Sequence, residues 1–168
     1  MRFEATLSIF EDSNLWKYHL EVPAEVVAKL LQTGSRRVVC TLDGKVRFQC
    51  ALMPAGADRW FINVNQGIRR KLGVEAGQRL QVTVEPDDSP YGLPMPEELK
   101  ELLVQDAEGN RLFHNLTPGR QRNLLYIVGS ARRSETRLRR AIVCIEHLKQ
   151  MKGKIDFKIL NQSLRNPD

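Results

Sequence analysis

The stretch Pro86–Pro96, PDDSPYGLPMP, divides the chain into two parts that have different periodicities. It holds four of the eight prolines, together with Gly92. Proline lacks an amide donor and disfavours helix in the residue before it. We therefore expect a linker or a rigid strap here, which gives a first domain of residues 1–88, a linker of residues 89–96 and a second domain of residues 97–168.

Upstream of this stretch, apolar and polar residues alternate, as is typical of strands with one buried face. Asp43-Gly44 predicts a type I′ turn between two of these strands. Six strands and two short helices predict a small β-barrel. The expected strands are Phe3–Ile9, Trp16–Val22, Val38–Leu42, Lys45–Leu52, Arg59–Val64 and Arg79–Glu85, and the expected helices are Ala24–Leu31 and Gln66–Leu72.

The first domain contains an internal similarity between Val22–Leu30, VPAEVVAKL, and Val64–Leu72, VNQGIRRKL. Each segment is followed by a glycine, Gly34 or Gly77, and then by a strand. This predicts a pseudo-repeat of strand, helix and strand around a pseudo-twofold axis. Chance similarity is the alternative, because only the first Val, the Lys and the Leu are identical.

Downstream, the apolar spacing becomes helical, so the whole chain is predicted to be of the α+β class. Thr117-Pro118 predicts one helix start, and Ser134 is expected to cap a last long helix, Glu135–Lys152. Ile155, Phe157 and Ile159 alternate and predict an extended tail. The apolar face of the last long helix is expected to consist of Leu138, Ala141, Ile142, Ile145 and Leu148.

The charge is distributed unevenly along the chain. Residues 1–110 hold 13 basic and 16 acidic residues, a net charge of −3, whereas residues 111–168 hold 13 and 4, a net charge of +9. This asymmetry indicates two modules, of which the second could have an anionic partner such as RNA or DNA.

The most basic stretch is Ser130–Arg140, SARRSETRLRR, with five arginines and one acid. The planar guanidinium group suits phosphate and carboxylate equally, and an exposed aromatic ring would add a stacking surface. A solvated helix face, or arginines that pair with carboxylates inside the fold, is the alternative interpretation. The candidate anion- or nucleic-acid-binding residues are Arg120, Arg122, Arg132, Arg133, Arg139, Arg140 and Tyr126.

Arg137 is expected to have a different role. It lies in the first turn of the last long helix, where the helix dipole disfavours a cation. A carboxylate partner, from the first domain or from Glu97–Glu101, would offset that cost. We therefore predict that Arg137 forms a structural ion pair.

The sequence shows no pattern that is typical of an enzyme. His19, His114 and His147 are far apart, and we expect solvated or capping side chains, with His19 on the outer face of a strand. No catalytic residue, metal site or cofactor is predicted. An enzyme with a site in a cleft between barrel and helices is the least favoured alternative.

The cysteines and the N-terminus bear on location. A two-residue turn at Asp43-Gly44 would place Cys40 and Cys50 on opposite faces of the hairpin, so free thiols are expected. Three cysteines, the absence of an apolar signal segment and the absence of a run of ~20 apolar residues predict a cytoplasmic protein without a membrane span. Monomer and homo-oligomer are equally compatible with the sequence.

Two segments carry family resemblances. Residues 1–88, with EVPAEVVAKL, TLDGKVRFQCAL and INVNQGIRRKLGVEAGQRLQVTVEPDD, resemble a bacterial and archaeal family of small β-barrels of unknown function. Residues 94–148, with MPEELKELL and LTPGRQRNLLYIVGSARRSETRLRR, resemble the OmpD-associated or bacteriocin-protection helical family. The resemblance implies a bacterial, non-enzymatic binding protein with a link to envelope or antimicrobial-peptide stress.

A more distant resemblance links INVNQGIRRKLGVEAGQRLQV to the swapped-hairpin barrels of AbrB-type transition regulators. That resemblance implies DNA binding by the barrel. The sequence departs from the AbrB pattern at Gln78, where an acidic residue is usual, and at Ala24-Glu25, where basic residues are expected.

Overall fold

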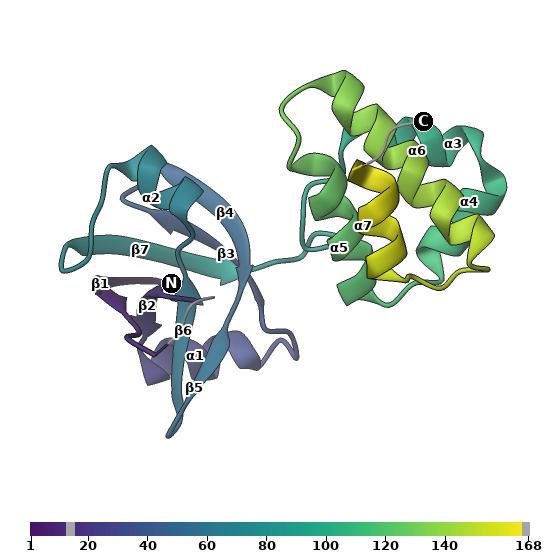
Figure 1. Ribbon diagram of the computed structural model, residues 1–168. Coiled ribbons are helices and arrows are strands. Elements are labelled where there is room, and N and C mark those ends of the chain that lie inside the picture. The colour runs from purple at the N-terminus through teal and green to yellow at the C-terminus, as the bar shows by residue number, and fades with distance from the viewer. Residues whose placement is uncertain (13–15, 166–168) are drawn as a thin grey trace. The chain divides into compact units, whose positions relative to one another are not determined.

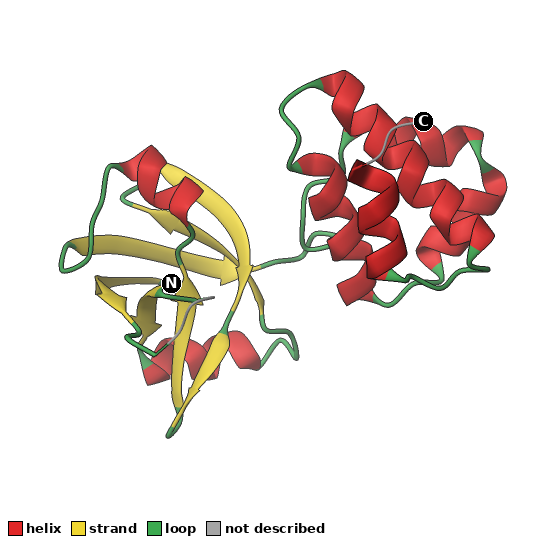
Figure 2. Cartoon of the chain, viewed as in Figure 1, coloured by secondary structure: helices red, strands yellow, loops and turns green. Residues whose placement is uncertain are grey.

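The computed structural model describes residues 1–12 and 16–165 and divides into two compact units, Met1–Asp88 and Ser89–Asp168. The first unit consists of strands with two short helices (Figure 1), and the second consists of helices (Figure 2). The chain is therefore of the α+β class. Among the described residues, no helix has the length and apolarity needed to cross a membrane.

The first unit is built on one antiparallel sheet of seven strands. The strands are β1 (Arg2–Ile9), β2 (Tyr18–Val22), β3 (Arg37–Leu42), β4 (Val46–Ala51), β5 (Met53–Gly56), β6 (Arg59–Asn63) and β7 (Arg79–Pro86), in the spatial order β4-β3-β7-β1-β2-β6-β5. β1 pairs with β7 through its first residues and with β2 through its last, so the sheet curls along this strand. The two edge strands, β4 and β5, are consecutive in the chain and are separated only by Leu52.

The prediction of a closed six-stranded barrel is wrong in detail, because the sheet has a seventh strand. The chain bends at Leu52, whose amide donates to the carbonyl of Arg36, and β5 then pairs with β6 rather than with β3. The sequence of β5, MPAG, contains a proline and shows no clear alternation, so it carries no strand signal.

The Asp43-Gly44 turn has the predicted conformation but the wrong predicted register. Both residues have positive φ, 50° and 64°, and the amide of Lys45 donates to the carbonyl of Leu42. The loop contains Lys45 as a third residue after Asp43 and Gly44, and Leu42 therefore pairs with Val46. The shift by one residue places Cys40 and Cys50 on the same face, contrary to prediction.

The two thiols are close neighbours in the unoxidised state. Cys40 lies opposite Phe48, and Cys50 lies opposite Val38. A hydrogen bond with Cys50, followed by burial, raises the pKa of the Cys40 thiol. Both cysteines are free, as is Cys144.

The sheet order has the symmetry of the internal repeat. One half consists of β2, the helix α1 (Ala24–Leu31) and β3, and the other of β6, the helix α2 (Gln66–Leu72) and β7. β2 pairs with β6 and β3 pairs with β7, so equivalent strands are neighbours. Gly34 and Gly77 both have positive φ, 74° and 89°, at the equivalent turns.

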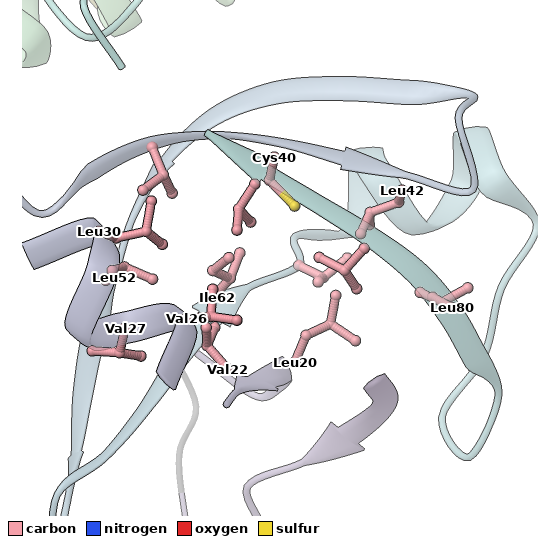
Figure 3. Close-up of a cluster of buried hydrophobic side chains, with 14 of the residues drawn as sticks. Leu20, Val22, Val26, Val27, Leu30, Cys40, Leu42, Leu52, Ile62 and Leu80 are labelled. Carbon is pink, nitrogen blue, oxygen red and sulfur yellow. The ribbon is translucent and has the colours of Figure 1, made fainter. Parts of the chain in front are cut away.

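The core of the first unit lies inside the curl of the sheet. Figure 3 shows Val26, Val27 and Leu30 of α1 facing side chains of the strands, with the sulfur of Cys40 among them. Burial of apolar surface here is the main stabilising term of this unit.

Within residues 89–165, the second unit has five helices, and one of them is central. The helices are α3 (Glu97–Gln105), α4 (Ala107–His114), α5 (Pro118–Gly129), α6 (Ser134–Gln150) and α7 (Phe157–Arg165). α6 contacts each of the other four, and Figure 1 shows it running between them. Side chains of the strap, Tyr91, Leu93 and Met95, pack against the helical core, so the strap belongs to this unit.

The predicted extended tail is wrong, because Phe157–Arg165 is the helix α7. A carboxylate oxygen of Asp156 accepts hydrogen bonds from the amides of Lys158 and Ile159, which caps the helix start. Three alternating apolar residues favoured a strand. The cap by Asp156 and the burial of Leu160 in the helical core stabilise a helix instead.

The predicted apolar face of α6 is also wrong in part. Ala141, Ile145 and Leu148 are buried, whereas Leu138 and Ile142 are 45% and 44% exposed. Cys144 and His147 belong to the buried face in their place. α6 begins at Ser134 with Arg133 as its N-cap, so the predicted serine cap is absent.

Gly109 provides a stability test of the packing between α4 and α6. A Cβ atom at this position would lie 2.5 Å from Cγ2 of Ile145. Gly109→Ala should therefore lower the free energy of unfolding by about 1–3 kcal/mol, the usual cost of overpacking. Denaturant unfolding followed by far-UV circular dichroism measures this change.

Gly119→Ala is the matched control. A Cβ atom at Gly119, in the first turn of α5, would meet no described atom within 4 Å. Because alanine favours helix, this variant should be neutral or more stable by up to about 1 kcal/mol. Equal destabilisation by the two substitutions would contradict the close approach of α4 to α6.

Candidate functional site

Arg137, in the first turn of α6, forms an ion pair with Glu98 in the first turn of α3. Nε of Arg137 lies 3.0 and 2.9 Å from the two carboxylate oxygens of Glu98, and Nη2 lies 2.8 Å from Oε1. The hydroxyl of Ser134 donates to the same oxygen at 2.6 Å. Only 28% of the Arg137 side chain and 13% of the Glu98 side chain are exposed.

The same guanidinium also fixes the loop before α6. Nη1 of Arg137 donates to the carbonyl of Ala131 at 3.2 Å and to that of Arg132 at 2.8 Å. One side chain thus joins α3, the loop between α5 and α6, and α6 itself. We call this set of contacts between Glu98, Ser134 and Arg137 the clamp.

The clamp changes the protonation equilibrium of its carboxylate. The hydrogen bonds from Arg137 and then from Ser134 lower the pKa of Glu98 from 4.5 to about 2. The carboxylate in turn raises the pKa of Arg137. The dipole of α6 disfavours a cation in its first turn, and Glu98 offsets that effect.

Two more arginines of α6 bind other helices of the second unit. Nη1 of Arg140 donates to the carbonyl of Ile127 at 2.8 Å and to the hydroxyl of Ser130 at 3.0 Å, at the end of α5. Nη1 of Arg139 donates to the carbonyl of Leu164 in α7 at 3.3 Å. Arg139 and Arg140 were both candidate anion-binding residues, and in the folded chain both donate to uncharged groups of their own unit.

The arginines of SETRLRR therefore point to three different helices rather than along one ligand-binding stripe. Arg137 reaches α3, Arg140 reaches α5 and Arg139 reaches α7. The far end of α6 follows the same principle, since Lys149 pairs with Asp106, which caps α4. The cations of α6 connect it to every helix that surrounds it.

The guanidinium groups of the other four candidate arginines make no hydrogen bond or ion pair with the residues that the structure describes. Arg120 and Arg122 lie at the start of α5, and Arg132 and Arg133 lie in the loop after it. α5, which holds the first pair near its start and ends before the second pair, is about 18 Å long at 1.5 Å per residue. Tyr126 is 68% exposed and lies one turn after Arg122 on the same face.

The boundary at Asp88 determines how the net charge divides between the two units. Residues 1–88 hold 12 basic and 11 acidic residues, so the first unit carries a net charge of +1. The negative excess lies in residues 89–110, which hold one basic and five acidic residues. The negative net charge of residues 1–110 thus comes from the strap, α3 and the start of α4, and not from the barrel strands.

The prediction of solvated or capping histidines is met in part, since His114 is exposed whereas His19 and His147 are buried. His19 is 7% exposed because Phe10 stacks on it at 3.5 Å, and burial lowers its pKa. His147 is buried and accepts a hydrogen bond from the amide of Asp156 at the start of α7. His114 bonds with the hydroxyl of Tyr91 at 2.8 Å.

Sequence reasoning included Glu97–Glu101 among the possible partners of Arg137 but did not single out Glu98, and it assigned Ser134 only as a cap. It gave no partner for Arg139 or Arg140. The spacing of Glu98 and Ser134 gives no signal, because they are 36 residues apart and meet only in the folded chain. Within residues 1–12 and 16–165, no group of three His, Cys, Asp or Glu side chains could hold a metal ion.

Two family models match the chain. Residues 3–84 match a domain of unknown function, DUF1905, and residues 93–151 match the family described as bacteriocin-protection, YdeI or OmpD-associated. The second match begins in the strap and ends just after α6, so it includes the complete clamp. No curated protein sequence matches the chain.

The pH dependence of stability tests the clamp. The pKa of Glu98 in the folded state is depressed to about 2, so its contribution is complete above the ordinary value of 4.5 and is lost as the pH falls toward about 2. Glu98→Gln should therefore lower the Tm of the second unit at neutral pH, and the difference from wild type should vanish near pH 2. Thermal unfolding across this range measures it.

Glu101→Gln makes the same chemical change one turn further along α3, outside the clamp. This control should follow the wild-type curve at every pH. A difference between wild type and Glu98→Gln that stays constant down to about pH 2 would show that the carboxylate charge plays no part.

Proposed function

We propose that the protein is a non-catalytic binding protein that helps to protect a bacterial cell against bacteriocins or related antimicrobial peptides. The observation that carries this proposal is the match of residues 93–151 to the bacteriocin-protection family. The matched segment contains α3 to α6 and the contacts that hold these helices together.

A groove between α3 and α6 supports a binding role. It has a volume of about 300 Å³ and is lined by Leu102 and Leu138 together with acidic side chains, among them Glu101. Leu138 and Ile142, one turn apart on α6, extend the apolar surface. Apolar and acidic lining of this kind matches a cationic amphipathic helix in both properties.

The basic charge of the second unit does not oppose this role. The excess of +9 belongs to residues 111–168, and part of it is bound to carboxylates and carbonyls inside the unit. The α3 side of the groove has the opposite sign. A cationic peptide is therefore repelled by some faces of this unit and attracted by the groove.

A survival assay tests the proposal. A bacteriocin-sensitive strain that expresses the chain should survive a higher concentration of the peptide than the strain with an empty vector. Glu101→Lys, which reverses a charge in the groove, should remove most of the advantage.

Glu108→Lys is the matched control, because it reverses an exposed charge of α4 outside the groove. It should protect as well as wild type. No protection by the wild-type chain would overturn the function, whereas full protection by Glu101→Lys would overturn the assignment of the groove.

Nucleic-acid binding is the second candidate, favoured by the four arginines without partners among the described residues and by exposed Tyr126. Arg122→Ala and Arg133→Ala should then each weaken binding to duplex DNA or single-stranded RNA regardless of sequence. Each should also reduce the slope of log K against log salt by about one. Arg47→Ala, whose side chain pairs with Glu85 in the first unit, is the control.

The same titration separates the two possible nucleic-acid surfaces. If the barrel binds DNA in the AbrB-like manner, Arg70→Ala in α2 should change the slope, and Arg122→Ala and Arg133→Ala should not. No binding by the wild-type chain at low salt would eliminate nucleic-acid binding altogether.

A further inference from the structure

A second concave site lies wholly within the helical unit, between the strap, α3 and α4. Its volume is about 410 Å³, within the range of small-molecule pockets. The strap contributes Tyr91 and Met95, α3 contributes Glu97, Lys100 and Leu103, and α4 contributes His114.

Hydrogen bonds fix the orientation of the polar wall. Nδ1 of His114 lies 2.9 Å from the carbonyl of Asn110, so this nitrogen carries the proton. The other ring nitrogen, Nε2, therefore accepts from the hydroxyl of Tyr91 at 2.8 Å. The proton of Tyr91 is committed to His114, and its oxygen keeps lone pairs that can accept from a molecule in the pocket that Tyr91 lines.

The rim carries one charge of each sign. Glu97 and Lys100 are one turn apart on α3, and neither forms an ion pair with a described residue. Their acidic neighbours Glu98 and Asp106 are both paired. A small zwitterion, which carries a carboxylate and an ammonium group a short distance apart, would satisfy both charges on the rim at once.

The floor of the pocket is apolar. Leu103, which is 5% exposed, and the half-buried Met95 of the strap contribute apolar lining, and the exposed Val104 of α3 extends it at the surface. An aliphatic side chain fits this floor and gains free energy by leaving water.

We propose that this pocket binds a small zwitterion with an apolar side chain, either a free α-amino acid or a dipeptide. Lys100 binds its carboxylate, Glu97 and the oxygen of Tyr91 bind its ammonium group, and Leu103 with Met95 contacts its side chain. Glu97 also lines the groove between α3 and α6, whereas Tyr91, Lys100 and Leu103 line this pocket alone. The proposal does not depend on the protective function.

The test uses the full ¹⁵N-labelled chain and four probes: leucine, isocaproate, isoamylamine and leucyl-leucine. Isocaproate lacks the amine of leucine, and isoamylamine lacks its carboxylate. Leucine should shift the amide signals of Leu103, Val104 and His114 in NMR spectra. Each of the two truncated analogues should bind about three- to fivefold more weakly, as expected for the loss of one exposed ionic contact.

Two variants assign the charges. Lys100→Met should remove the preference for leucine over isoamylamine, and Glu97→Gln should remove the preference for leucine over isocaproate. Glu101→Gln, outside this pocket, should keep both preferences. Both charged positions are exposed, so the substitutions should leave the far-UV circular dichroism spectrum unchanged.

The affinity of leucyl-leucine relative to leucine distinguishes the two sources of the ligand, since tighter binding points to a dipeptide and weaker binding to the free amino acid. The proposal is overturned if no probe shifts these three amides, or if isocaproate binds wild type as tightly as leucine does.

Discussion

The second unit depends on the bond between Glu98 and Arg137. Two cationic or polar groups, Arg137 and Ser134, converge on one carboxylate, and the same arginine binds two carbonyls of the loop before α6. Removing either charged partner would strand the other in a largely covered position. The clamp thereby sets where α6 begins and how it lies against α3, and the remaining helices pack on α6.

This arrangement explains the most basic part of the sequence. Arg133, Arg137 and Arg140 have the i, i+4, i+7 spacing of one ligand-binding stripe, yet Arg137 binds α3 and Arg140 binds α5, while Arg139, on another side of α6, binds α7. Arg132 and Arg133, in the preceding loop, have no such partner among the described residues. The stretch thus combines architecture with a smaller exposed basic surface, and the groove and the pocket beside α3 are the hollowed sites of this unit that carry the functional proposals.

Local rules predicted most elements, and contacts between distant residues account for the errors. Thr117-Pro118 and the change of periodicity placed helix starts, and Asp43-Gly44 gave the turn type. The third loop residue, Lys45, shifts the hairpin register by one and brings Cys40 and Cys50 to the same face, and the Asp-Gly pair alone does not predict this shift. The need of Arg137 for a carboxylate followed from the helix dipole, but the identity of Glu98 required the fold, because the two residues are 39 positions apart.

A double-mutant cycle between Glu98→Gln and Arg137→Met tests the central claim most directly. Both tryptophans, Trp16 and Trp60, lie in the first unit, so fluorescence follows that unit and far-UV circular dichroism mainly follows the helices. The clamp predicts a clear coupling energy in the circular dichroism transition and an unmoved fluorescence transition. Coupling no larger than that of the exposed pair Arg47–Glu85 would contradict it.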